Sequence, residues 1–175
     1  MLNEKYYSIL LKNYYKNTNK VRNHLLKSIK FAIDNGATGF ILSYEGYFNK
    51  MALNICREFR KIYPFLIIKI VIMDLNMHFQ RDTNEYKKLY KYYEDIDIIF
   101  YYPDPNKNKI YQLYNFLIIK SLWTMSYITK PLQQLFKQLC QHKYISVIDL
   151  KNLQKLCFHK KNDELPHQIL KSIFI

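Results

Sequence analysis

The sequence is poor in the residues from which the most recognisable functional motifs are built. Its 175 residues include three glycines, three cysteines and five prolines. The few glycines are not arranged as the Gly-rich fingerprint of a phosphate-binding loop, so no cofactor is implied. Three cysteines do not make a disulfide framework. No apolar run reaches the roughly 18 residues of a membrane-spanning helix, and the N-terminus lacks a signal-peptide pattern, so we expect a cytoplasmic protein with no membrane partner.

Arginine is also scarce, although the chain is strongly basic. There are 27 Lys and Arg residues against 14 Asp and Glu, a net charge of +13, and only four of the basic residues are arginines. A charge of this sign suggests nucleic acid as a partner. Arginine is the better bidentate ligand for phosphate, however, and the lysines are spread along the chain. We therefore keep nucleic-acid binding as an alternative and favour a solvated basic surface.

What the sequence does contain is an alternation of helical spacing with short apolar runs rich in β-branched residues. Strands that alternate with helices form parallel β-α-β units, and helices cover both faces of such sheets. We predict the α/β fold class: a Rossmann-like, mostly parallel sheet flanked by helices, with a helical C-terminal extension. The predicted strands are 6–11, 38–43, 66–73, 97–102 and 122–128, and the predicted helices are 19–35, 49–62, 83–94, 110–119, 131–142 and 146–157.

The composition changes near Pro131, which suggests a division of the chain. We predict a Rossmann-like domain over 1–130 and a helical extension packed on it over 131–175. The second helix of the extension would run from Ser146 to Cys157. Two helices joined by a turn can also form a DNA-binding motif, but the apolar and amide composition does not favour a recognition helix.

The C-terminal region also contains four residues of the types that bind zinc, two cysteines and two histidines. They form two Cys-x-His pairs, Cys140 with His142 and Cys157 with His159. Positions i and i+2 do not share a helix face, and structural zinc sites usually separate paired ligands by two or more residues. We therefore predict no metal site.

Ligands of parallel α/β sheets bind at the carboxyl ends of the strands, and three residues with suitable chemistry lie there. Ser43 ends a predicted strand, and its favoured role is to cap the next helix rather than to act as a nucleophile or phosphate ligand. Glu45 lies in the following turn and His78 in the loop after the next predicted strand. Either could serve as an acid or base, although a solvated turn or loop residue is the simpler interpretation. No nucleophile–base pair is evident, so the catalytic residues stay unknown, with Glu45 and His78 as weak candidates.

Several stretches occur in the order and spacing of a known family. They are 35–43, 44–52, 62–71, 78–80, 92–99 and 111–119, beginning Asn35-Gly-Ala-Thr-Gly-Phe and including Ile62-Tyr-Pro-Phe-Leu-Ile. Together they resemble the SLOG superfamily of Rossmann-like proteins, and within it the YpsA type, which is related to the DprA and lysine-decarboxylase-like groups. The likeness covers about 100 residues.

This resemblance implies a nucleotide-binding domain with ligand contacts at Gly46, Asn49, Gln80 and Asn115. Several positions depart from the family pattern. Ser43 replaces the first glycine of the nucleotide-binding turn, and Tyr114 replaces the arginine of an Arg-Asn pair. The Pro-Gly-Gly motif of the related nucleoside monophosphate hydrolases is absent. We therefore expect the Rossmann-like scaffold to be kept, while most residues of the family's nucleotide-binding turn are replaced.

Our leading hypothesis is a divergent SLOG-type domain that binds a nucleotide, a nucleotide-derived ligand or a protein partner without catalysis. The alternatives are a basic nucleic-acid-binding protein of DprA-like fold and a small nucleotide hydrolase. Self-association into a homo-oligomer is also left open. The predicted ligand-binding residues are Ser43, Glu45, Gly46, Asn49, His78, Gln80 and Asn115.

Overall fold

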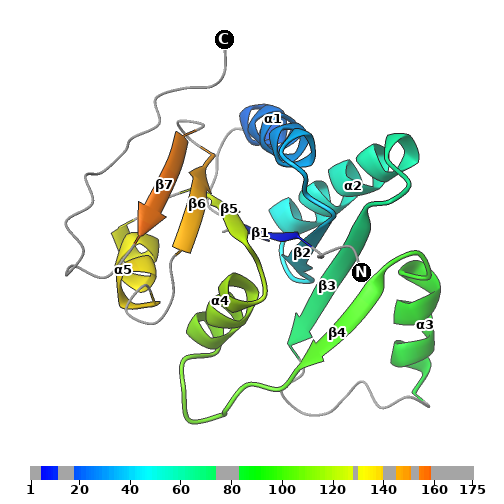
Figure 1. Cartoon of the computed structure of the whole chain (residues 1–175). Helices are drawn as coiled ribbons and strands as arrows, with labels where there is room; N and C mark the ends of the chain where they lie inside the picture. The colour runs from blue at the N-terminus through cyan, green and yellow to red at the C-terminus, as the bar shows by residue number, and fades with distance from the viewer. Residues whose placement is uncertain are drawn as a thin grey trace.

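The described residues of the computed structural model form one mixed sheet flanked by helices (Figure 1). The structure describes residues 5–11, 18–73, 83–127, 130–139, 145–150 and 154–158. Within these ranges the sheet has seven strands in the order β4-β3-β2-β1-β5-β6-β7. The strands are β1 (Tyr6–Leu10), β2 (Gly39–Ser43), β3 (Ile67–Met73), β4 (Asp97–Tyr101), β5 (Trp123–Ser126), β6 (Ile145–Asp149) and β7 (Gln154–Phe158), and the helices are α1 (Thr18–Asp34), α2 (Tyr47–Ile62), α3 (Asn84–Tyr92), α4 (Lys109–Ile119) and α5 (Lys130–Leu139).

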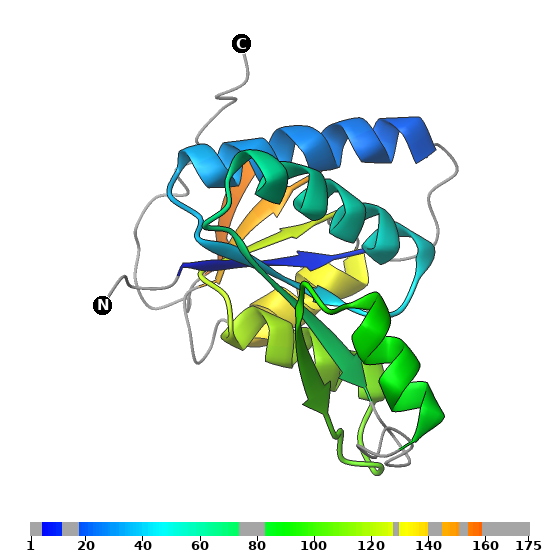
Figure 2. The same ribbon diagram turned by 90° about the vertical axis from the view of Figure 1, so that its right-hand side faces the viewer.

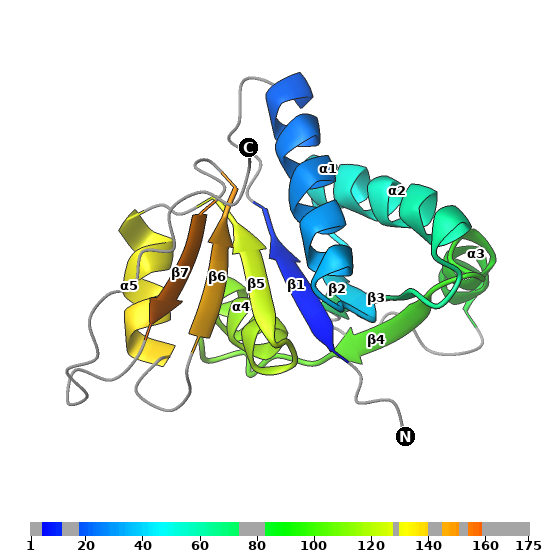
Figure 3. The same ribbon diagram turned by 45° about the horizontal axis from the view of Figure 1, so that its top comes forward.

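All neighbouring strands from β4 to β6 run parallel, and β7 runs antiparallel to β6. The chain first builds outward from β1 to β4. It then crosses back through α4 to place β5 on the other side of β1 (Figure 3). The strand order therefore reverses between β1 and β5, and this reversal is the topological switch point at which open α/β sheets bind ligands.

The reversal also divides the helices between the two faces of the sheet. Apolar residues of α1, α2 and α3 share one core cluster with β1 and β2, whereas those of α4 and α5 share a second cluster. Figure 2 shows α1 and α2 on one side of the sheet and α4 and α5 on the other. Right-handed crossovers produce this division, because a connection that changes direction along the sheet must also change face.

The central strands are the buried ones, as a sheet covered on both faces requires. Every residue of β1 and β2 is buried. At Gly39 the packing leaves no room for a side chain, because a Cβ would lie 2.5 Å from the Ile67 carbonyl oxygen and 2.6 Å from the Tyr6 ring. The glycine therefore lets β2 lie tightly between its neighbours.

The predicted α/β fold class is confirmed, and most predicted elements appear within a few residues of their expected bounds. The predicted first strand is β1, and the predicted helix 131–142 is α5 (Lys130–Leu139), with its Leu132, Leu135 and Phe136 stripe buried. The predicted helix 49–62 begins two residues earlier, at Tyr47.

The helix predicted over Ser146–Cys157 is wrong. This segment contains β6, which pairs parallel with β5, and β7, which returns antiparallel beside β6. Its apolar residues recur at helical spacing but also fit two short strands around a turn, and a neighbouring strand supplies hydrogen bonds that local spacing does not record. The sheet therefore continues beyond residue 130, and within the described part of 131–158 the only helix is α5.

Candidate functional site

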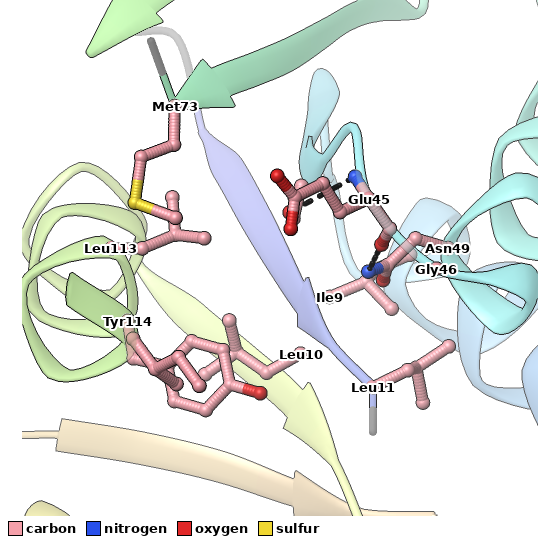
Figure 4. A pocket seen from close by; sticks show the side chains of 11 residues that line it. Ile9, Leu10, Leu11, Glu45, Gly46, Asn49, Met73, Leu113 and Tyr114 are labelled. Atoms are coloured by element: carbon pink, nitrogen blue, oxygen red, sulfur yellow. Dashed lines mark hydrogen bonds between the residues drawn. The ribbon is translucent and has the colours of Figure 1, made fainter. Parts of the chain in front are cut away.

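A cavity of about 260 Å³ opens at the carboxyl ends of β1, β2 and β3, between the start of α2 and α4. It lies beside the switch point that the strand order defines. Figure 4 shows its two sides, with Glu45, Gly46 and Asn49 facing Met73, Leu113 and Tyr114 across the end of β1. The lining residues are Ile9, Leu10, Leu11, Ser43, Glu45, Gly46, Asn49, Met73, Ile110, Leu113 and Tyr114.

One wall of the cavity is apolar, and α4 contributes three residues to it: Ile110, Leu113 and Tyr114. The helix begins where the Asn108 side chain accepts a hydrogen bond from the Tyr111 backbone N–H at 3.0 Å. That start point directs Leu113 and Tyr114 toward the cavity and the sheet (Figure 4). Burial raises the pKa of the Tyr114 phenol, so the hydroxyl stays protonated at neutral pH and can donate a hydrogen bond.

The opposite wall is polar and is formed by the turn between β2 and α2. The Ser43 hydroxyl accepts a 3.4 Å hydrogen bond from the Glu45 backbone N–H. Asn49, one turn into α2, donates through its Nδ2 to the Glu45 carbonyl oxygen. These bonds hold the turn in place and leave the exposed Glu45 carboxylate at the cavity.

The Asn49 side chain presents a hydrogen-bond acceptor that is not used by the described residues. Asn49 is 6% exposed, and its Oδ1 has no hydrogen-bond partner among them. The orientation of the amide follows from its neighbour, because only Nδ2 can donate to the Glu45 carbonyl. Leaving a buried acceptor unsatisfied costs about 1–3 kcal/mol. A ligand group that donates to Oδ1 would remove this cost.

The first turn of α2 adds backbone donors to the same wall. Gly46 occupies the N-cap with φ 96° and ψ 147°, and no side chain caps the helix. A positive φ of this size suits glycine and is strained for other residues. The first N–H groups of a helix have no partner within it, and together with the helix dipole they favour an anion or a hydrogen-bond acceptor.

The favoured role of Ser43 as a helix cap is therefore wrong. Gly46 holds the N-cap position, and the Ser43 hydroxyl meets the Glu45 N–H in the turn before the helix. The physical reason is that α2 starts only after the turn has reversed the chain at Gly46. Ser43 is left at the end of β2, where it lines the cavity.

Four of the seven predicted ligand-binding residues come together in this cavity: Ser43, Glu45, Gly46 and Asn49. Asn115 is half-buried on α4 and is not among the lining residues, although its Oδ1 also lacks a hydrogen-bond partner among the described residues. His78 and Gln80 lie outside the described residues.

Sequence reasoning missed the apolar half of the site. Ile9, Leu10 and Leu11 at the end of β1, Met73 at the end of β3 and the α4 residues Ile110, Leu113 and Tyr114 all line the cavity. The carboxyl ends of the predicted strands 6–11 and 66–73 were a usable signal, because the same rule that selected Ser43 applies to them. No local sequence pattern indicates that α4 residues line the cavity, because their position depends on how the chain crosses back over the sheet.

A second polar group lies at the carboxyl ends of β5 and β6. His24 on α1 and Tyr127 share a 3.0 Å hydrogen bond between Nδ1 and the phenol oxygen. Burial, together with Lys20 and Lys27, lowers the pKa of His24, and Asp149 partly opposes this change. Burial and the neighbouring Asp149 raise the pKa of Tyr127 to about 12. Unlike the Asn49 amide oxygen, His24 and Tyr127 satisfy each other.

Two further observations concern a metal site and a membrane partner. Among the described residues, no group of three or more His, Cys, Asp or Glu side chains is placed to hold a metal ion. Cys157 is an exposed free thiol on β7, whereas the other residues of the two Cys-x-His pairs, Cys140, His142 and His159, lie outside the described ranges. No helix in the described part of the chain combines the length and apolarity needed to cross a membrane.

No protein-family model matches this sequence, and no curated protein is detectably similar to it. The functional interpretation therefore depends on the fold, the cavity and the unsatisfied Asn49 Oδ1.

Proposed function

We propose that this chain is a binding domain that takes a nucleoside-type small ligand, with or without a phosphate, in the cavity at the ends of β1, β2 and β3. The proposal places the chain as a divergent, non-catalytic SLOG-type domain. The observation that carries it is Asn49, which lines the cavity and whose buried Oδ1 lacks a hydrogen-bond donor among the described residues. Buried polar groups in folded proteins are nearly always paired, so an unpaired one on a residue that lines a cavity supports a ligand that reaches it when bound.

The lining favours a ligand with a flat apolar part and hydroxyl donors. Leu10, Leu113 and Tyr114 offer an apolar surface to a ring, while the Glu45 carboxylate and Asn49 Oδ1 offer acceptors to sugar hydroxyls. Carboxylates accept from ribose hydroxyls in other Rossmann-like sites. The uncapped start of α2 provides donors for a phosphate.

The size of the cavity limits the ligand further. Cavities that bury small molecules usually measure about 300–1,000 Å³. The 260 Å³ found here lies just below that range. It suits one nucleoside or mononucleotide rather than a dinucleotide.

The absence of catalysis in this proposal rests on the partners of the candidate groups. Nucleophilic catalysis needs a hydroxyl or thiol within hydrogen-bond reach of a base. In the cavity the Ser43 hydroxyl is bonded to the Glu45 backbone N–H rather than to a base. Glu45 itself is exposed, as suits a residue that meets a ligand hydroxyl.

Thermal unfolding with adenosine, guanosine, AMP, cyclic AMP and ADP-ribose tests the proposal. A ligand present at 100 times its Kd stabilises the fold by about 2.7 kcal/mol. For a domain of this length that corresponds to a Tm increase of about 5–10 °C. We expect adenosine or guanosine to produce a shift, and a larger shift for AMP would indicate that its phosphate meets the start of α2.

Two variants connect the shift to the cavity. Asn49→Ala and Glu45→Gln should each reduce or abolish it. Asn54→Ala is the matched control, because Asn54 lies on the same helix but is exposed and outside the cavity. The proposal fails if no compound shifts the Tm, or if the shift survives Asn49→Ala unchanged.

A second candidate function is binding of single-stranded nucleic acid along α3. Lys87, Lys88 and Lys91 are exposed on this helix, and Tyr90 and Tyr92 beside them are 43% and 64% exposed. Lysines interleaved with aromatic rings can hold a phosphate backbone while the bases stack. The net charge of +13 supports the same interpretation.

Salt dependence separates this second function from non-specific attraction. Replacing Lys87, Lys88 and Lys91 with Gln should weaken binding to single-stranded DNA and reduce the slope of log K against log salt by about 0.7 for each lost phosphate contact. The control removes the same charge from Lys27, Lys50 and Lys61 on α1 and α2, which are also exposed. Equal losses in the two triple variants would assign the binding to net charge alone.

A further inference from the structure

The two edges of the sheet are built differently. At one edge, β7 closes an antiparallel hairpin with β6 and carries Lys155 in its sequence. At the other edge, β4 pairs with β3 on one side and with no described strand on the other (Figure 3). After Asp97, β4 contains only apolar and aromatic residues, Ile-Ile-Phe-Tyr. Natural proteins usually protect a sheet edge with lysine, proline, a bulge or a covering element.

The side chains of β4 are also less covered than those of the central strands. Ile98, Ile99, Phe100 and Tyr101 are each half-buried, whereas every residue of β1 and β2 is buried. One face of β4 packs under α3, where Phe100 stacks on Tyr86 at 5.8 Å between ring centres. The other face meets α4, where Tyr101 lies 4.8 Å from Phe116. Both faces are thus anchored within the chain, and no described strand lies along the outer edge of β4.

We propose that β4 pairs antiparallel with β4 of a second copy of this chain, with Ile99 on the two-fold axis. The strand sequence Asp-Ile-Ile-Phe-Tyr is close to self-complementary in this register. Ile99 meets Ile99, each Ile98 meets Phe100, and each Asp97 carboxylate meets a Tyr101 hydroxyl that can donate to it. Apolar pairs and such opposed polar pairs stabilise antiparallel ladders.

The charges around β4 favour the same antiparallel arrangement. Exposed Glu94 and Asp97 make the amino end of the strand negative. The segment 103–109 after its carboxyl end contains two lysines and one aspartate. A two-fold pair brings the acidic end of each copy to the basic end of the other. A parallel pair of identical strands would instead oppose like charges, so charge complementarity selects a second copy in this orientation.

The pairing continues the sheet from one copy into the next without using the cavity. The cavity lies at the ends of β1, β2 and β3, and no β4 residue lines it. A dimer through β4 therefore leaves ligand binding intact, and its test is independent of the proposed function. Because the contact is isologous, it closes at two copies and does not build a filament.

Sedimentation equilibrium of the full chain gives the first test. We expect a concentration-dependent mixture of the 21.4 kDa monomer and a dimer of twice that mass. Ile99→Lys should abolish the dimer, since inward-pointing charge is one of the ways in which natural edges avoid pairing. A chain that stays monomeric at millimolar concentration, or that grows past the dimer, overturns the proposal. So does an Ile99→Lys variant that folds and still dimerises.

A cysteine at the two-fold axis gives a second test that does not depend on the stability of Ile99→Lys. Opposed residues of an antiparallel pair have Cα atoms about 4.5–5.5 Å apart, within the range that a disulfide spans. In a Cys140→Ser, Cys157→Ser background, Ile99→Cys should form a covalent dimer on mild oxidation. Ile119→Cys is the matched control, because Ile119 is an exposed isoleucine outside the strand. Equal cross-linking of the two variants would assign the products to random collision and overturn the proposal.

Discussion

Two polar regions of the sheet differ in whether their hydrogen bonds are complete. Between β1 and β5 the polar side chains pair with one another: Ser8 lies 2.9 Å from Thr124, Ser121 donates to Ser8, and Ser126 donates to the Leu10 carbonyl. Across β1, in the cavity, the buried Asn49 Oδ1 has no such partner among the described residues. The comparison suggests that a complete hydrogen-bond network holds neighbouring strands together, whereas an incomplete one marks a place where a ligand can bind.

The largest expected effect comes from a change that deforms the strand supporting the cavity. Gly39→Ala adds a Cβ that would sit 2.5 Å from the Ile67 carbonyl oxygen, so β2 must move away from β3. Overpacking of a well-packed core costs about 1–3 kcal/mol, and we expect the upper end because the obstacle is backbone. Urea unfolding measures the change. Gly36→Ala is the control: its Cβ would meet nothing closer than 4.0 Å, so any loss there reflects the φ of +84°.

The next largest effect tests the complete network. Thr124→Val keeps the shape of the side chain but removes the hydroxyl that pairs with Ser8, which is fully buried. Ser8 still accepts from Ser121 but loses its hydrogen bond to Thr124. An unsatisfied buried polar group costs about 1–3 kcal/mol, so we expect a loss of about 2 kcal/mol in urea unfolding. If Thr124→Val left the free energy of unfolding unchanged, the structural role of this network would be contradicted.

A smaller effect is expected where the network is incomplete. Asn49→Ala removes the hydrogen bond to the Glu45 carbonyl, which is worth about 1 kcal/mol, but it also removes the unsatisfied Oδ1. The two effects oppose each other, so ligand-free stability should fall by less than about 1 kcal/mol, and by less than in Thr124→Val. A loss larger than that of Thr124→Val would show that Asn49 is a structural residue.

The smallest effect concerns pH and the paired His24. Because the folded pKa of His24 is lowered, the unfolded chain binds more protons between that pKa and the ordinary value of about 6.5. This contribution to stability is complete above the ordinary pKa and is lost as the pH falls toward the folded pKa. NMR titration of His24 should give a midpoint below 6.5. In His24→Gln this part of the pH dependence of unfolding should disappear. A His24 titration midpoint above 6.5 in the unaltered protein would contradict the conclusion that burial lowers its pKa.

Half of the candidate site could be predicted because it follows from local sequence. Ser43, Glu45, Gly46 and Asn49 are consecutive or nearly so, and they follow a strand that its apolar run identifies. Any parallel strand places such residues at the ligand-binding edge. Met73 and Tyr114 are 30 or more positions from Ser43, and no local pattern indicates that they face it. The helix predicted over Ser146–Cys157 failed for a related reason, because strand pairing with β5 outweighs local spacing.

By itself the sequence determined the alternation of elements from β1 to β5, since apolar periodicity and turn residues act over a few neighbouring positions. It also determined the basic charge of the chain. Only the tertiary structure decided the strand order, the reversal between β1 and β5, and the faces that the helices cover. The cavity, the unsatisfied Asn49 Oδ1 and the edge of β4 that no described strand covers all result from that order, because each depends on which strand lies beside which.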